Sequence, residues 1–335
     1  MKRNIKIINL KAFIALIVVL IVFGVLVTGC SLFGRETVSG ETGEQEEPVD
    51  GEAGEKEEPE DESPPTDVEI SREIEKDFNL IEKTVENIEA IFNFIDENIT
   101  DSNPELASNM IYAAIKLCEA YKAAFEEKFT DPEVMATIYA FSTTAVDDGK
   151  LDLVVLKGIG DEKVREIVEE AINKKYKLIM SEGMVEPVID YRAYDEYMQY
   201  LSPEMKDYLD IKIDESEKPA LMDAAITIPM DDFIQRILKS MNYLEKYPDS
   251  PRYDEIEQFK DQRMWIYLGG TDNSPVFDSN GKIIPDKLNG FRDALTKYPD
   301  TGFAEVLASY LDLLEEENYA RTDKIKDFLD EIYKI

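Results

Sequence analysis

The stretch that decides the fold is residues 70–99, ISREIEKDFNLIEKTVENIEAIFNFIDENI. Its large apolar residues recur at alternating spacings of four and three, at Ile74, Phe78, Ile81, Val85, Ile88, Phe92, Ile95 and Ile99. This heptad pattern predicts one long helix that buries a single apolar stripe. Ile91 widens the stripe, which favours packing inside a helical bundle over a narrow two-stranded coiled coil.

Two further helices are predicted to cover this stripe. Asn103-Pro104 and Asp131-Pro132 each combine a preferred N-cap residue with proline at the first helical position. Residues 68–150 are therefore predicted to form an N-terminal helical bundle with short connections. Cys118 lies beside Leu117, a residue of the second apolar stripe, and is expected in the core. We expect a monomer, and dimerisation through the first helix is the alternative.

The C-terminal region, residues 230–335, uses the same helix ending twice. Lys246-Tyr247-Pro248-Asp249-Ser250 and Lys297-Tyr298-Pro299-Asp300-Thr301 each follow one amphipathic segment and precede another. This arrangement resembles tetratricopeptide-type helical hairpins, and the resemblance implies pairs of antiparallel helices. Gly269 to Ile284 separates the two copies and is predicted to be a small non-helical insert.

The insert also contains a weak echo of a calcium-binding loop. Asp278 and Asn280 have the spacing of two EF-hand ligands, but Val276 and Lys287 would occupy the essential end positions. We therefore predict a turn at Asn280-Gly281 between two short strands. The sequence predicts no metal site and no cofactor.

The region between these parts, residues 151–229, has no steady period and is predicted to be irregular and helical. Tyr191, Tyr194, Tyr197 and Tyr200 recur every third residue. Because this spacing drifts around an α-helix, we expect some of the rings to be exposed, and they are the candidate partner surface. Amphipathic packing of the rings, with their hydroxyl groups at the rim of the core, is the alternative. The same region supplies the candidate acid/base residues of a carboxylate-dependent enzyme, Glu182, Glu186, Asp190 and Asp195.

Gly158-Ile159-Gly160, followed by Val164 and Ile167, resembles the helix-hairpin-helix motif of DNA-binding proteins. The resemblance implies that phosphate would sit at the start of the following helix. Asp161 and Glu162 crowd that position, and a formal charge of −35 repels nucleic acid. We therefore predict no nucleic-acid partner and interpret the glycines as a turn before an ordinary helix.

Residues 1–29 have the pattern of a secretory signal peptide. The basic residues Lys2, Arg3, Lys6 and Lys11 precede an apolar run from Phe13 to Val27, and small residues then lead to Cys30. Val27-Thr28-Gly29-Cys30 resembles the lipobox of bacterial lipoproteins. That resemblance implies cleavage before Cys30, lipidation of its thiol and acylation (for example by palmitate) of its new amine. An uncleaved membrane anchor is the alternative.

Residues 30–67 are predicted to be a disordered acidic linker. They are rich in Glu, Gly, Pro and Ser and almost lack large apolar residues after Phe33, so they cannot bury enough surface to offset chain entropy. The whole arrangement resembles lipoproteins common in clostridia-like bacteria. The resemblance implies a location at the extracytoplasmic face of the cell membrane, held by the lipid anchor, and implies no activity.

Composition narrows the possible functions. The chain has 72 acidic and 37 basic residues and no histidine. The absence of histidine removes histidine-based catalytic triads and the usual zinc sites. We therefore expect an all-α lipoprotein, a helical bundle followed by tetratricopeptide-like hairpins. Its expected function is a binding or scaffold module for an envelope protein, peptide or glycan. A carboxylate-dependent enzyme acting on an envelope substrate is the alternative, although no enzymatic site can be named.

Overall fold

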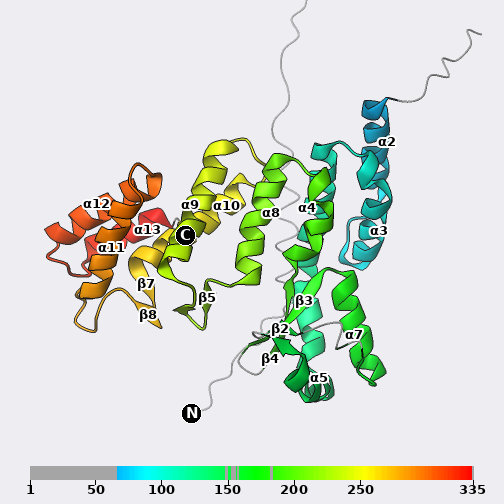
Figure 1. Ribbon diagram of the computed structural model, residues 1–335, viewed down its shortest axis with the longest axis horizontal. Coiled ribbons are helices and arrows are strands. Elements are labelled where there is room, and N and C mark those ends of the chain that lie inside the picture. Colours follow the sequence, from blue (N-terminus) through cyan, green and yellow to red (C-terminus); the bar gives the residue numbers. More distant parts are fainter. Residues whose placement is uncertain (1–65, 148–149, 152–155, 157, 182–183, 334–335) are drawn as a thin grey trace, which may run out of the picture. The chain divides into compact units, whose positions relative to one another are not determined.

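A computed structural model of the protein describes residues 66–147, 150–151, 156, 158–181 and 184–333 (Figure 1). This part of the chain is mostly helical with small sheets, which confirms the predicted all-α class with a small non-helical insert. The predicted signal peptide, Cys30 and nearly all of the linker lie outside the described residues. Among the helices that are described, none combines the length and the apolar character needed to cross a membrane.

The predicted first helix is two α-helices with a break between them. A capping box of Thr66 and Glu69 starts α2 (Asp67–Leu80), and after a 3₁₀ turn, η2 (Val85–Asn87), the chain continues as α3 (Ile88–Asn98). In the break, the Lys83 ammonium donates to the Phe78 carbonyl (2.9 Å) and the Asn87 amide donates to the Glu82 carbonyl (2.8 Å). Such side-chain bonds to the backbone compete with the helical ladder. The prediction of one continuous helix was therefore wrong.

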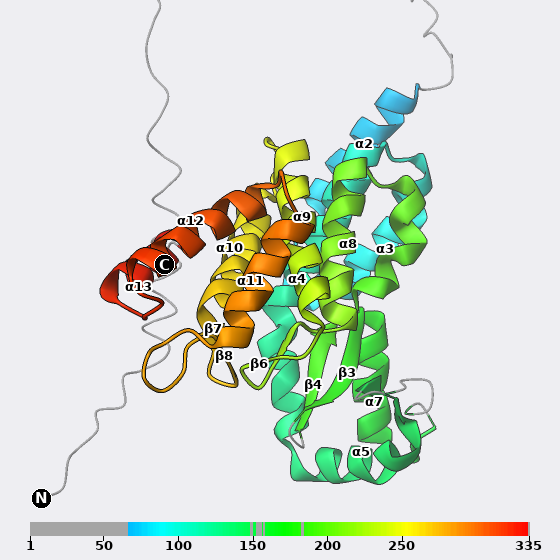
Figure 2. The same ribbon diagram turned by 60° about the vertical axis from the view of Figure 1, so that its left-hand side comes forward.

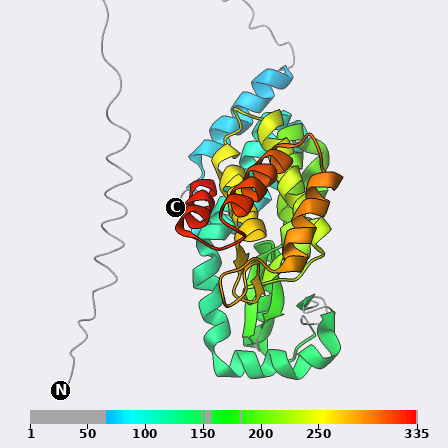
Figure 3. The same cartoon turned by 90° about the vertical axis from the view of Figure 1, so that its left-hand side faces the viewer.

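The apolar stripe is nevertheless buried within the monomer. The members of the stripe on the helices before and after the break are buried, while Ile81 and Val85, next to the break itself, are half-buried. The covering helix is α4 (Pro104–Glu126), which follows the short η3 (Ile99–Asp101). The other predicted cover, α5 (Pro132–Ala145), instead contacts α7 (Glu162–Asn173) and η4 (Glu127–Thr130). Figures 1 and 3 show α5 near the end of α4 that is remote from α2.

A four-stranded antiparallel sheet that the sequence did not predict joins the end of the predicted bundle to the middle region. Its order is β1 (Val146–Asp147), β2 (Lys150–Leu151), β3 (Tyr176–Ser181) and β4 (Met184–Ile189). Strands β3 and β4 form a long hairpin in which Lys177 pairs with Val188 and Ile179 with Glu186. One face of the hairpin packs on α4, where the Tyr176 hydroxyl donates to the Cys118 carbonyl. The middle region is therefore not purely helical.

The remaining elements follow in chain order and complete two apolar cores. The first core includes the bundle, the sheet and η5, and the second is formed by the C-terminal hairpins, which lie beside α8 in Figure 2. Both Tyr-Pro-Asp endings lie where predicted, between α9 and α10 and between α11 and α12. The elements are η5 (Tyr191–Tyr200), α8 (Pro203–Glu217), β5 (Leu221–Met222), β6 (Ala225–Ile226), α9 (Met230–Lys246), α10 (Tyr253–Gly269), β7 (Gly270–Thr271), β8 (Ser274–Pro275), α11 (Pro285–Lys297), α12 (Gly302–Glu316) and α13 (Asp323–Ile332).

The insert after α10 has the predicted turn. Gly281 has a φ of +72°, and the Asp278 carboxylate accepts the backbone N–H groups of Asn280 (2.8 Å) and Lys282 (2.9 Å). A single bridge between Phe277 and Ile283 flanks this turn in place of two strands. The short strands of the insert, β7 and β8, come earlier. The Asp278 carboxylate therefore stabilises the turn by accepting these hydrogen bonds.

Candidate functional site

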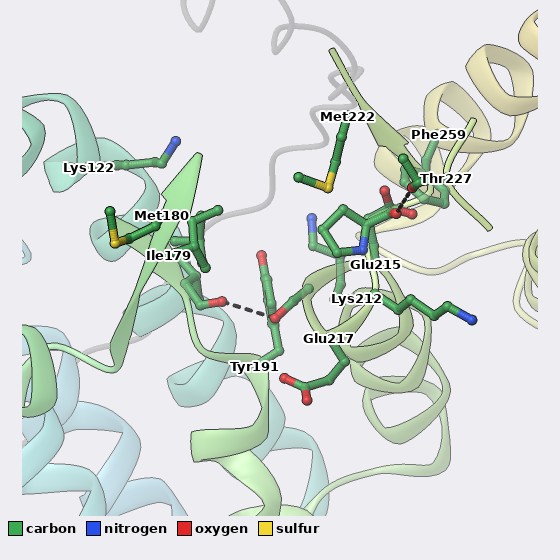
Figure 4. A pocket seen from close by; sticks show the side chains of 15 residues that line it. Lys122, Ile179, Met180, Tyr191, Lys212, Glu215, Glu217, Met222, Thr227 and Phe259 are labelled. Atoms are coloured by element: carbon green, nitrogen blue, oxygen red, sulfur yellow. Dashed lines mark hydrogen bonds between the residues drawn. The ribbon is translucent and has the colours of Figure 1, made fainter. Parts of the chain in front are cut away.

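An open cleft of about 550 Å³ lies between the β3–β4 hairpin, the C-terminal half of α8, the β5–β6 hairpin and α10 (Figure 4). We call it the apolar cleft because most of the surface that lines it is apolar. Ile179 and Met180 lie on one side of it in Figure 4, and Met222, Thr227 and Phe259 lie on the other. Its polar lining consists mainly of Lys122, Tyr191, Lys212, Glu215, Ser216, Glu217 and Lys218.

The apolar walls follow from the register of the hairpin. Paired residues of an antiparallel ladder point to the same face, so Ile179 and Val188 both lie on the face opposite Tyr176 and Leu178. Tyr176 and Leu178 are fully covered, whereas Ile179 and Val188 remain half-buried at the cleft. The fold therefore leaves aliphatic surface of the sheet open to the cleft.

The edge of the sheet beside the cleft is blocked. Strand β4 is the last strand of its sheet, and the Ser216 hydroxyl of α8 donates to the Ile189 carbonyl (3.3 Å). Pro187 has no N–H to offer an added strand. The Lys177 ammonium fixes the end of α8 by donating to the Ser216 carbonyl and to Glu217, both at 2.7 Å. A ligand would therefore be held by side-chain contacts and not by strand addition.

The lysines of the apolar cleft already have carboxylate partners. Lys122 pairs with Glu126 (2.8 Å), and Lys218 approaches Asp232 (3.7 Å). Lys212 pairs with Glu255 (2.9 Å).

The Glu215 carboxylate, which also lines the cleft, is held between two guanidinium groups. It pairs with Arg236 and Arg263 at 2.8 Å each. The charges at the cleft are thus balanced locally, and the walls present mainly apolar surface.

A second, polar cleft of about 310 Å³ adjoins the first. It shares Lys212 and Phe259 with the apolar cleft and is completed by Glu255, Ile256, Gln258, Gln262 and Tyr333. Burial alone would raise the pKa of Glu255. The neighbouring ammonium groups of Lys212 and Lys116 and a hydrogen bond from Tyr208 (2.9 Å) outweigh burial and lower that pKa. Glu255 is therefore held as a carboxylate.

Three of the four predicted tyrosines are core residues. Tyr191, Tyr194 and Tyr197 are buried and Tyr200 is half-buried, so these side chains do not form the exposed partner surface that the sequence suggested. The segment is the 3₁₀ helix η5, with three residues per turn, so residues three apart lie on one face. Tyr191 still contributes to the lining of the apolar cleft. The spacing of three was itself the signal of a 3₁₀ helix.

The predicted carboxylates do not assemble into an acid/base pair. Glu182 lies outside the described residues. Glu186 is on β4, Asp190 caps η5 by accepting the Arg192 N–H (3.1 Å), and exposed Asp195 pairs with the Arg192 guanidinium (3.3 Å). Among the described residues, none of these three carboxylates lines either cleft.

Two other residues singled out in the sequence lie at α7 and α4. The Asp161 carboxylate accepts the Val164 N–H (3.1 Å) and occupies the helix start where phosphate would bind. Cys118 is buried as predicted, and burial raises the pKa of its thiol to about 12, which makes it unreactive. Within the described part of the chain, no three potential metal-binding side chains gather.

The sequence offered little sign of the cleft itself. Ile179 and Val188 lie in strands that were not predicted. The proline-containing breaks Lys218-Pro219 and Ile228-Pro229 do flank the β5–β6 hairpin and could have located it. Comparison with protein-family models, with curated proteins and with solved structures finds no match to this chain.

Proposed function

We propose that this protein is a lipid-anchored, extracytoplasmic binding module that holds an apolar segment of an envelope protein or peptide. The observation that carries the proposal is the apolar cleft, whose aliphatic walls remain half-exposed while its lysines are already paired. Apolar pockets with a few polar groups are the usual form of a ligand site. Charge balance at the rim leaves burial of apolar surface as the main source of affinity.

The lining favours a protein or peptide ligand over a glycan. Met180 and Met222 are flexible, polarizable side chains that adapt to different apolar partners. Met222 is 47% exposed, so it can change position without unpacking a core. Aliphatic walls offer little hydrogen bonding to the many hydroxyl groups of a sugar. The proposed ligand therefore presents large apolar side chains.

Binding can be tested with a displayed library of short peptides and the full chain in detergent. Val188→Asp places a charge in the half-exposed wall of the apolar cleft. We expect it to weaken selected apolar peptides by about tenfold or more, corresponding to roughly 1.4 kcal/mol. Leu80→Asp is the matched control because Leu80 is 76% exposed on α2, which does not line the cleft. Equal losses in both variants, or selection of glycans alone from a parallel glycan array, would contradict the proposal.

The proposed anchor rests on the lipobox-like residues Val27 to Cys30 and on the acidic linker behind them. Two or more acyl chains hold a protein firmly at a membrane, whereas one chain binds only marginally. Cys30→Ala should release the protein from the membrane fraction or leave an unprocessed precursor. Mass spectrometry and fractionation check this, and an unchanged mass with unchanged retention would refute lipidation.

A further inference from the structure

We infer that the apolar and polar clefts form one elongated site for an extended peptide with an apolar stretch next to an uncharged polar stretch. This inference rests on the proposed binding function and adds the class of ligand. Lys212 and Phe259 line both clefts, so the two spaces lie next to each other at these side chains. A chain long enough to cross this boundary would place neighbouring residues in two chemically different environments.

Gln258 and Gln262 are the groups suited to bind the polar stretch. They are four residues apart on α10, so they lie on the same helix face, and both line the polar cleft. Gln258 is exposed, and no hydrogen bond links its amide to the rest of the described chain. The side-chain carbonyl of Gln262 accepts a hydrogen bond from the Arg263 guanidinium (3.0 Å). The NH₂ group of Gln262 therefore points away from Arg263. Side-chain amides of this kind can both donate to and accept from peptide groups.

The charges around the polar cleft favour an uncharged ligand segment. The Glu255 carboxylate already accepts from Tyr208 (2.9 Å), Tyr112 (3.2 Å) and Lys212 (2.9 Å). Lys116 lies 3.8 Å from the same carboxylate and also pairs with Glu119. An added charge would have to displace one of these partners. A neutral serine- or glutamine-containing segment requires no such displacement.

Phe259 marks the boundary between the two environments, and its position is fixed. The Arg263 guanidinium lies 4.4 Å from the centre of the Phe259 ring. Glu215, which lines the apolar cleft, pairs with the same guanidinium at 2.8 Å. Arg263 itself is buried. Tyr333, which also lines the polar cleft, packs its ring against Trp265 with centroids 6.3 Å apart. Phe259 at the boundary and Tyr333 in the polar cleft are therefore both held by protein contacts of their own.

The experiment uses the full chain in detergent and fluorescence anisotropy. Its probes are a synthetic peptide with an apolar half and a serine–glutamine half, a peptide containing only the apolar half, and a fluorescent fatty acid. The double variant Gln258→Leu/Gln262→Leu should weaken the two-part peptide by about five- to tenfold and leave the apolar peptide unchanged. Val188→Asp should weaken both peptides. Both glutamines are at least partly exposed, and an unchanged melting temperature confirms that the variant is folded.

The outcomes separate this inference from the proposed function. If Val188→Asp weakens both peptides while the double glutamine variant weakens neither, the elongated site is wrong and the apolar peptide site stands. If neither peptide binds and the fatty acid binds in a Val188-dependent manner, the cleft is a lipid site and both proposals fail. Equal weakening of both peptides by the glutamine variant would show a general effect and would also overturn the two-part site.

Discussion

The seam between α4, α8 and α10 differs sharply from the C-terminal hairpins. The seam buries Arg252 at 2% exposure together with Ser108 and Ser202, whereas the described residues beyond Arg263 contribute no buried charged side chain. In the hairpins, aromatic and aliphatic side chains of α10 to α13 pack with one another. The hairpins beyond Arg263 are thus held mainly by burial of apolar surface, and the seam also depends on buried, hydrogen-bonded ions.

The polar groups of the seam converge on Glu204. Its carboxylate accepts from the Arg252 guanidinium (2.6 Å), the Ser250 hydroxyl (2.7 Å) and the Tyr243 hydroxyl. Arg252 also donates to the Ser108 carbonyl (3.4 Å) of α4. These contacts tie the bundle and α8 to the turn between α9 and α10. Buried ions of this kind are costly to leave without their partners.

The largest expected effect is therefore at Arg252. Arg252→Met should lower the free energy of unfolding by about 3–5 kcal/mol because the Glu204 carboxylate would lose its ionic partner in a largely buried place. The double variant Arg252→Met/Glu204→Leu should recover much of that loss, since it removes both ions. Chemical denaturation measures both changes. A loss below about 1 kcal/mol for the single variant would mean that water reaches Glu204 and screens it.

Apolar packing is expected to be equally strong on both sides of this comparison. Ile88 of α3 and Ile325 of α13 are both fully buried, one in each core. Each Ile→Ala change should cost roughly 2–5 kcal/mol through lost burial and a residual cavity. Denaturation at several protein concentrations checks this. A midpoint that rises with concentration, or an oligomer that dissociates when Ile88 is shortened, would contradict the expected monomer.

The same contrast explains what could be predicted from the sequence. The hairpins were located because their apolar periods and Tyr-Pro-Asp endings are local signals. The Arg252–Glu204 pair joins residues 48 positions apart, and no local pattern indicates it. The break at Ile81 to Thr84 was missed because the apolar spacing continues through it while backbone bonds do not. The β3–β4 hairpin was missed because Tyr176, Lys177 and Leu178 are all buried, so the alternation typical of a strand is absent.

The candidate site was harder to predict than the fold for the same reason. The apolar cleft is assembled from α4, two hairpins, α8 and α10, and none of its walls is recognisable alone. The tyrosine segment drew attention because its spacing was regular, and that regularity reflects packing in a 3₁₀ helix. In this protein the regular sequence patterns mark residues that pack in the core, whereas the open aliphatic surface of the cleft is formed by residues that follow no pattern.

Acid should weaken the seam before it weakens the hairpins. Burial raises the pKa of Glu255, but Lys212, Lys116 and Tyr208 outweigh it, so the folded pKa lies below the ordinary value of 4.5. A carboxyl group with a lowered folded pKa contributes stability above its unfolded pKa and loses it as pH falls through the folded value. Stability should therefore decline as pH falls below about 4.5, and Glu255→Gln should flatten this decline. Hydrogen exchange should show earlier loss of protection in α8 than in α12, and the reverse order would contradict the assignment.

The smallest expected effect concerns the β5–β6 turn, which lies beside the apolar cleft. Asp223 and Ala224 have φ values of +45° and +49°, a region that costs a residue with a side chain roughly 1–2 kcal/mol. The backbone persists there because Asn273 donates to both residues, from its N–H to the Ala224 carbonyl (3.0 Å) and from its amide to the Asp223 carbonyl (2.6 Å).

Ala224→Gly should relieve that strain and raise the free energy of unfolding by about 0.5–1 kcal/mol, since the added freedom of glycine in the unfolded chain offsets part of the gain. Gly270→Ala is the opposite test. Gly270 has a φ of +80°, and an added Cβ would lie 2.6 Å from the Val276 nitrogen, so this change should destabilise the protein. If Ala224→Gly instead lowered the melting temperature, the turn would owe its conformation to contacts of the Ala224 methyl group. Peptide affinity should stay unchanged in Ala224→Gly, because Met222, and not the turn, lines the apolar cleft.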